Sequence, residues 1–259
     1  MHIHALDSYR PAESPVHRLD PRVKLVLAVS LILAAALTPE RAWAIFALLQ
    51  GLLLVIELFS RVGLGLVQQR SLTALPFTLA ALTVTFSTPG RPLWMLGPWA
   101  ITEAGLLRFV SIVIRAYISI QAAVLLAATT PFPDVLWGMR ALRIPRTLVA
   151  IGGFLYRYLF VLADEAQRLL RARQARSAAP DGRGGGSLAW RARVAGGMAG
   201  SLFIRSYERS ERIYAAMLAR GYDGEVRTMD PPALRPVDWA VGAVGLMVLA
   251  AVVVVGQVT

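Results

Sequence analysis

The 259-residue chain contains no cysteine and only three histidines. Disulfide bonds, thiolate metal sites and cysteine nucleophiles are therefore excluded. Charged residues are also scarce, at 17% of the chain, whereas a soluble domain carries about 25%. Hydrophobic residues make up 56%, against about 45–50% in a typical soluble domain. This composition indicates a membrane protein, and it excludes a disordered chain.

Long apolar stretches recur along the chain, and a membrane-spanning helix needs about 20 mostly apolar residues. Pro, Gly or charged residues separate consecutive stretches, as expected between helices. Stretches of this length without polar alternation predict helices rather than barrel strands. We therefore predict an all-α polytopic membrane protein with about five membrane-spanning helices. The five stretches are residues 23–37, 43–59, 72–87, 105–130 and 237–258.

Acidic residues are the rarer charge, with 16 Asp and Glu against 27 Lys and Arg, a net charge of +11. With the N-terminus inside, residues 1–22, 60–71 and 131–236 face the cytoplasm. These segments and Lys24 hold all basic residues except Arg41, Arg91, Arg108 and Arg115. Because Lys and Arg stay preferentially on the cytoplasmic side, we predict a cytoplasmic N-terminus and an outer C-terminus in the inner or plasma membrane. The basic charge is then mainly a topology signal.

The segment 131–236 separates the membrane helices of residues 1–130 from the last span in residues 237–259. It is predicted to hold two long helices, at about 146–177 and 187–220, joined by a Gly-rich turn and arranged as a crossed pair. Residues 147–163 are apolar apart from Arg157, so they form either a sixth span or a helix lying along the membrane. The charged second half favours the latter. Gly196, Gly197 and Gly200 are predicted to let another helix approach closely.

No catalytic constellation is recognisable, because the chain lacks a phosphate loop, a Gly-x-Ser-x-Gly motif and a His-Glu-x-x-His motif. His2 and His4 are a potential metal site, but an incidental place in the N-terminal tail is favoured. We expect Glu57 to lie near the membrane interface. Arg115 is expected to pair with Glu57 or Glu103, or to reach the interface, and a place on a substrate pathway is the less favoured alternative. We predict no catalytic, cofactor-binding or metal-binding residue.

Both long inner helices end in Ala-Arg followed by a small residue. An arginine there interacts favourably with the helix dipole and is able to form a bidentate pair with a carboxylate. Two copies suit a partner with two equivalent grooves, although helix-end arginines are common in themselves. The copies are Ala175, Arg176 and Ser177, and Ala219, Arg220 and Gly221.

These paired motifs resemble those of the transmembrane (T) component of energy-coupling-factor (ECF) transporters. The stretch 216–224, Ala-Met-Leu-Ala-Arg-Gly-Tyr-Asp-Gly, is similar to that family's most recognisable sequence. The stretch 17–25, which contains Leu-Asp-Pro-Arg-Val-Lys-Leu, resembles its approach to the first span. The likeness covers residues 8 to 255, and the length and the stretch 6–9 are most similar to the cobalt branch, the CbiQ/EcfT type.

The resemblance implies a non-catalytic membrane scaffold. Its coupling helices would dock onto two ABC-type ATPases, identical or different, through the six residues of the two motifs. ATP and Mg would be bound by those ATPases, and this chain would carry no cofactor. The membrane part would hold a small hydrophobic substrate-capture subunit, metal-binding in the cobalt branch, with an accessory membrane subunit as a further partner. Cobalt uptake feeding cobalamin synthesis is the implied function, with nickel or a vitamin as alternative substrates.

Two other classes are weighed against this scaffold. A self-sufficient permease would need several metal ligands converging in the membrane, and the apolar stretches offer Glu57, Arg115, Met247 and little else. A nucleic-acid binder would show basic clusters with few acids, whereas acids accompany the bases throughout residues 131–236. We therefore expect a lipid bilayer and protein partners, and no nucleic acid.

Overall fold

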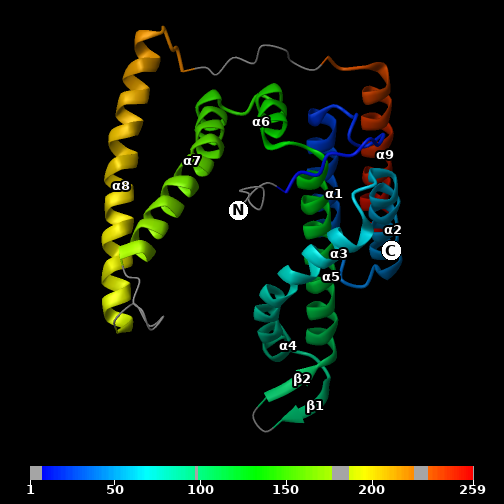
Figure 1. Ribbon diagram of the computed structural model, residues 1–259. Coiled ribbons are helices and arrows are strands. Elements are labelled where there is room, and N and C mark those ends of the chain that lie inside the picture. Colours follow the sequence, from blue (N-terminus) through cyan, green and yellow to red (C-terminus); the bar gives the residue numbers. More distant parts are fainter. Residues whose placement is uncertain (1–7, 97–98, 177–186, 225–232, 259) are drawn as a thin grey trace. The chain divides into compact units, whose positions relative to one another are not determined.

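The computed structural model describes residues 8–96, 99–176, 187–224 and 233–258 (Figure 1). Helices dominate these residues, and the predicted all-α membrane protein is confirmed. A two-stranded antiparallel β-hairpin, which the sequence did not lead us to expect, precedes the helix that begins at Glu103. The elements are α1 (Pro21–Leu37), α2 (Trp43–Ser60), α3 (Leu64–Ala74), the 3₁₀ helix η2 (Leu75–Leu82), α4 (Thr83–Ser87), β1 (Pro92–Leu96), β2 (Trp99–Thr102), α5 (Glu103–Thr129), α6 (Phe132–Ala141), α7 (Arg146–Arg176), α8 (Leu188–Ala219) and α9 (Pro236–Val258).

Four helices in the described part of the chain are long and apolar enough to cross a membrane: α2, α5, α7 and α9. Three of them coincide with predicted spans, and α1 covers a fourth with 17 residues. The predicted span 72–87 is wrong as a single helix, since it is divided among α3, η2 and α4. Pro76 lies at this break and has no N–H to continue the α-helical hydrogen bonds. Because α7 also meets the criteria, both arrangements considered for residues 147–163 stay predictions.

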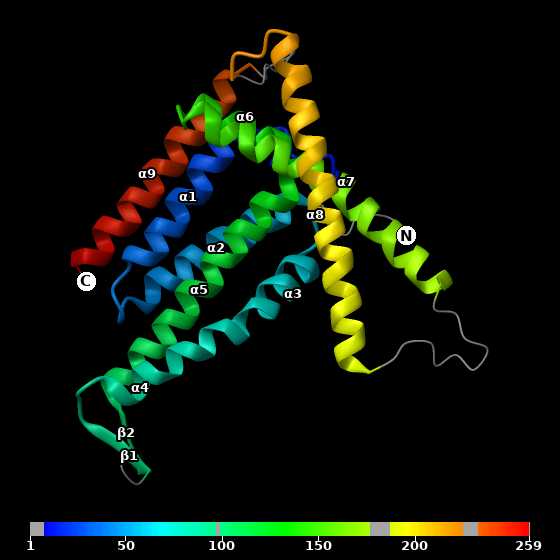
Figure 2. The ribbon, with the colours of Figure 1, turned by 90° about the vertical axis from the view of Figure 1, so that its left-hand side faces the viewer.

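The chain forms two compact units, and the first contains residues 8–142 and 230–258. Within it, α1 packs against α9, α5 and α6, as both views show (Figure 2). The core lies where α1, α2, α5 and α9 meet. Its buried side chains are Leu31, Ala34, Ala35, Ile45, Phe46, Leu49, Leu53, Ile118, Ala122, Leu125, Leu249 and Val252.

The short helix α6 belongs to this first unit because it packs on the start of α1. A Cβ at Gly138 would lie 3.4 Å from backbone atoms of Pro21, and the Arg22 guanidinium stands 4.1 Å from the centre of the Trp137 ring. The division of the sequence into 1–130, 131–236 and 237–259 follows expected topology and stays a prediction, while the compact units divide at 142/143 and 229/230.

The second unit contains α7 and α8, and the two long inner helices predicted from the sequence are confirmed within one or two residues at each end. Ser187 caps α8, because its hydroxyl accepts a hydrogen bond from the Trp190 N–H at 3.3 Å. Arg205 of α8 forms an ion pair with Glu165 of α7 at 3.4 Å. The Tyr222 ring, just beyond α8, meets the edge of Phe154 in the first half of α7. These two contacts make α7 and α8 an antiparallel pair.

Candidate coupling surface and helix-end junction

The first Ala-Arg motif lies at the C-terminus of α7. Arg176 is the last residue of that helix, and both Ala175 and Arg176 are exposed. Ser177 lies outside the described residues. An exposed guanidinium at a helix C-terminus sits beside unsatisfied carbonyl groups, where a positive charge is favoured.

The second motif forms the C-terminal cap of α8. Arg220 is the capping residue, and Gly221 follows it with a φ of +80°, a conformation that glycine adopts without steric cost. The Gly221 N–H bonds the Leu218 carbonyl and the Tyr222 N–H bonds the Met217 carbonyl, each at 3.0 Å. These bonds end the helix sharply and leave the Arg220 side chain exposed.

The antiparallel pairing places the two arginines far apart. Tyr222, two residues after Arg220, contacts Phe154 in the first half of α7. Arg176 lies at the C-terminal end of α7. An α-helix rises about 1.5 Å per residue, so the two motifs are separated by roughly 30 Å along α7. The α7–α8 pair therefore presents one arginine at each of its two ends.

The three glycines expected at a helix crossing lie in the first half of α8. A Cβ at Gly196, Gly197 or Gly200 would meet no other atom within 4 Å. The described contacts of α8 with α7 instead include the Glu165–Arg205 ion pair. These glycines are therefore not needed for the α7–α8 contact in this structure, and their role against another helix stays a prediction.

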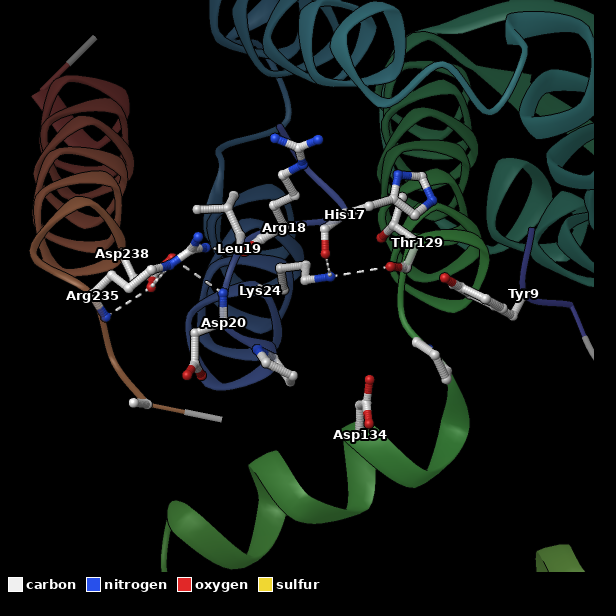
Figure 3. A pocket seen from close by; sticks show the side chains of 13 residues that line it. Tyr9, His17, Arg18, Leu19, Asp20, Lys24, Thr129, Asp134, Arg235 and Asp238 are labelled. Atoms are coloured by element: carbon white, nitrogen blue, oxygen red, sulfur yellow. Dashed lines mark hydrogen bonds and ion pairs between the residues drawn. The ribbon is translucent and has the colours of Figure 1, made fainter. Parts of the chain in front are cut away.

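A second polar site lies where the chain approaches α1, and Figure 3 shows its side chains. Asp20 caps α1, since its Oδ1 accepts the Arg22 N–H at 2.8 Å. The Asp20 N–H in turn donates to Asp238 Oδ1 at 3.3 Å, and Asp238 Oδ2 accepts from the Arg235 N–H at 3.0 Å. Asp238 thus caps α9 and also binds the backbone at the start of α1.

Lys24 adds the end of α5 to this junction. Its buried ammonium donates to the carbonyl oxygens of Thr129 at 3.1 Å and His17 at 3.3 Å (Figure 3). A cavity of about 380 Å³ lies beside these groups, and Asp134 of α6 also lines it. The Asp-Pro-Arg-Val-Lys stretch at residues 20–24 therefore joins the ends of α1, α5, α6 and α9.

Sequence comparison assigns this architecture to a family, because residues 12–230 match the CbiQ family, described as cobalt transport protein. The chain belongs to the CbiQ family. It is 30% identical over 249 residues to the ECF transporter transmembrane protein EcfT of Heliobacterium modesticaldum, covering 91% of each chain. It is 29% identical over 234 residues to EcfT of Limosilactobacillus fermentum, covering 83% of each chain. It is 32% identical over 163 residues to the cobalt transport protein CbiQ of Rhodobacter capsulatus, covering 61% of this chain and 64% of the relative.

The resemblance to T components of ECF transporters is thereby confirmed, and this CbiQ-family chain is a multi-pass membrane protein of a transport system. Among the described residues, no group of three or more His, Cys, Asp or Glu side chains is placed to hold a metal ion. His2 and His4 lie outside the described residues.

Glu57 and Arg115, which were expected to pair with each other or to lie near the interface, have other partners in the structure. Arg115 donates through its Nη2 to the carbonyl of Thr38 at 2.6 Å, just past the end of α1, and lies 6.0 Å from the centre of the Phe46 ring. Among the described residues, Arg115 forms no ion pair with the expected acidic partners, Glu57 and Glu103. Glu57 is 2% exposed, and its Oε2 accepts a hydrogen bond from Gln68 of α3 at 3.2 Å inside the CbiQ-family fold.

Asp238 and Arg235 are site residues that the sequence reading missed. Asp238 is a single acidic residue at the start of the last predicted span, yet it is 1% exposed and joins two helix starts. A signal was present, because an aspartate two positions after Pro236 fits the first turn of a helix. Its partner, the backbone of Asp20, is 218 residues away in sequence and could not be inferred without the fold.

Proposed function

We propose that this chain is the coupling subunit of an ECF-type importer, transmitting the motion of two ABC-type ATPases to a substrate-capture subunit. The supporting observation is the two exposed Ala-Arg helix ends on the antiparallel pair α7 and α8, called the helical hairpin below. These ends are roughly 30 Å apart along α7 by helical rise. Neither Arg176 nor Arg220 pairs with another described residue, so both guanidinium groups are available to a partner's carboxylates.

This geometry supports the following mechanism. ATP and Mg are bound by the ATPases, and closure of the ATPase dimer moves its two grooves together. Because each groove holds one end of the helical hairpin, closure changes the angle between α7 and α8. These rigid helices pass the change to the membrane helices, and the capture subunit tilts and releases its substrate inward. The N-terminus and the helical hairpin lie on the cytoplasmic side, and the C-terminus lies outside.

Cobalt, as a precursor for cobalamin synthesis, is the proposed substrate. The name of the matched family and that of the Rhodobacter capsulatus relative support it. Nickel or a vitamin is the alternative, because selectivity would reside in the metal-binding capture subunit, with its accessory membrane subunit, and not in this chain. Uptake of radioactive cobalt by cells expressing the assembled transporter, competed by nickel, distinguishes these substrates.

The coupling role is tested by Arg176→Ala and Arg220→Ala in the assembled transporter. Removing one partner of a buried charge pair costs about 2–5 kcal/mol, so each variant should lose ATPase subunits on purification or hydrolyse ATP without uptake. Arg171→Ala and Arg212→Ala are matched controls, since both are exposed arginines on the same helices. If the two single variants and the double variant assemble and transport normally, the coupling role is wrong.

A self-sufficient permease would be purified without other subunits, whereas the coupling subunit of an importer would be purified together with its partners. Affinity purification from membranes should recover an ATP-binding subunit and a small hydrophobic subunit with this chain. Transport by the chain alone in liposomes would favour the permease and contradict the proposal.

A further inference from the structure

A buried polar cluster lies between α2, α3 and α5, and it shares no residue with the two Ala-Arg motifs or with the helix-end junction. Glu57 of α2 is 2% exposed and Gln121 of α5 is 0% exposed. Gln68 of α3 and Tyr117 of α5 complete the cluster. Acidic side chains within membrane helices are costly and are therefore candidates for function.

Gln68 is the centre of the hydrogen bonds in this cluster. Its Nε2 donates to Glu57 Oε2 at 3.2 Å. Its Oε1 accepts from Gln121 Nε2 at 2.8 Å and from the Tyr117 hydroxyl. The donors of Gln121 and Tyr117 are thus directed to Gln68, and Glu57 receives a single hydrogen bond from the cluster.

Two buried acceptors are left without partners among the described residues, Glu57 Oε1 and Gln121 Oε1. Buried acceptors of this kind are rarely left without a hydrogen bond, because burial removes their hydrogen bonds to water and that loss costs free energy. Within the same described residues, no Lys, Arg or His forms an ion pair with Glu57. Among the described residues, these two acceptors therefore receive no hydrogen bond, and no positive charge pairs with Glu57.

We propose that the cluster binds one proton, which Glu57 carries in the folded protein. Protonation converts the carboxylate into a neutral acid, so the O–H becomes the missing donor and Gln121 Oε1 is the acceptor that the other bonds leave free. A water molecule would supply donors but would leave a buried charge uncompensated. A metal ion would need several free oxygens, whereas Gln68 Oε1 already accepts two hydrogen bonds. This proton site goes beyond the coupling role and does not depend on it.

The site is tested by infrared spectroscopy of the full chain in lipid nanodiscs at neutral pH. The wild type should show the C=O band of a protonated carboxylic acid, shifted on exchange into D₂O, and Glu57→Gln should lose it. Glu40→Gln is the control and should keep the band, because Glu40 is partly exposed and bonds Arg108 at 2.7 Å. Absence of the band in the wild type, or its persistence in Glu57→Gln, overturns the proposal.

A second variant keeps the test decisive if Glu57→Gln fails to fold. Gln121→Leu removes the acceptor and should shift the band to higher frequency without abolishing it. An unchanged band in Gln121→Leu overturns the assignment of the proton to this cluster. Replacing sodium by choline in the buffer should leave the band unaltered, and a band that appears only without sodium would show that the cluster binds a metal cation instead.

Discussion

Single side chains hold the ends of helices together in this protein. Asp238 accepts hydrogen bonds from the backbone of Asp20 and of Arg235, and Lys24 donates to two carbonyls at the end of other segments. Asp238 meets backbone N–H groups at the starts of α1 and α9, and Lys24 meets a carbonyl at the end of α5. A helix end leaves such groups unsatisfied, so these two buried charges stabilise three helix ends.

His17 gives this junction a measurable pH dependence. Its Nε2–H donates to the Arg10 carbonyl at 3.0 Å, and its Nδ1 forms a hydrogen bond with the Ser14 hydroxyl at 2.7 Å. Partial burial lowers the pKa of His17 below 6.5, the Arg10 bond opposes this shift, and the Lys24 charge adds to it.

Because the unfolded chain then takes up the proton first, the contribution of His17 to stability is present above the ordinary pKa and is lost as pH falls from there toward the folded-state pKa. Side-chain NMR should give a pKa for His17 below that of a model peptide. Thermal unfolding of His17→Gln should lose this part of the pH dependence, and a His17 pKa above the peptide value would contradict the expectation.

At the scale of elements, helix contacts depend on whether backbones are able to approach. Gly105 in the first turn of α5 is such a contact, because a Cβ there would lie 2.5 Å from the Thr85 carbonyl oxygen and 2.9 Å from Thr85 Cα in α4. Backbone atoms cannot move aside as a flexible side chain does, so α4 stays close to α5 only with glycine at this position.

Gly105→Ala should therefore lower stability by about 1–3 kcal/mol, the usual cost of overpacking. Gly51→Ala in α2 is the matched control, because a Cβ there meets nothing within 4 Å and alanine favours the helix by up to about 1 kcal/mol. Thermal unfolding in detergent compares the two variants. Equal stability of both would mean that α4 does not press on α5.

The contact of α1 with α6 is expected to carry a cation–π energy. Arg22 stands 4.1 Å from the centre of the Trp137 ring, and such pairs contribute about 0.5–2 kcal/mol. A double-mutant cycle of Arg22→Met and Trp137→Leu, measured by thermal unfolding, should give a coupling energy in that range. Additive effects of the two substitutions would assign the contact to simple packing.

At the scale of the whole molecule, the proposed topology places most of the basic residues on the cytoplasmic side, and the missing cysteines make that topology measurable. Ser8, Arg91 and Arg212 are exposed, and a single cysteine placed at any of them would have no competing thiol. With the N-terminus inside, a membrane-impermeant maleimide should label Arg91→Cys from outside and should reach Ser8→Cys and Arg212→Cys only after the membrane is opened. The reverse pattern would invert the proposed orientation.

The same labelling decides how α7 meets the membrane. Thr147 and Arg171 are exposed residues near its two ends. A helix lying along the membrane leaves Thr147→Cys and Arg171→Cys accessible from the same side. Labelling from opposite sides would establish α7 as a true span and would require the positions of later segments to be assigned again.

Much of this protein was determined by the sequence itself. Apolar length predicted α2, α5 and α9, and the alternation of apolar and charged segments predicted the long helices α7 and α8, because these signals are local. The paired motifs and the Asp-Pro-Arg stretch were sufficient for the family. Local signals failed at residues 72–87, where hydropathy is uniform but Pro76 interrupts the hydrogen bonding of a single helix.

Tertiary structure decided what depends on residues distant in the chain. Only the fold brings Asp238 to Asp20, gives Arg115 the Thr38 carbonyl and encloses Glu57 with Gln68 and Gln121. The physical reason is that an apolar run fixes where a helix lies along the sequence, whereas a buried polar group must find its partner wherever packing places one. The separation of Arg176 from Arg220 likewise required the antiparallel contact of α7 with α8.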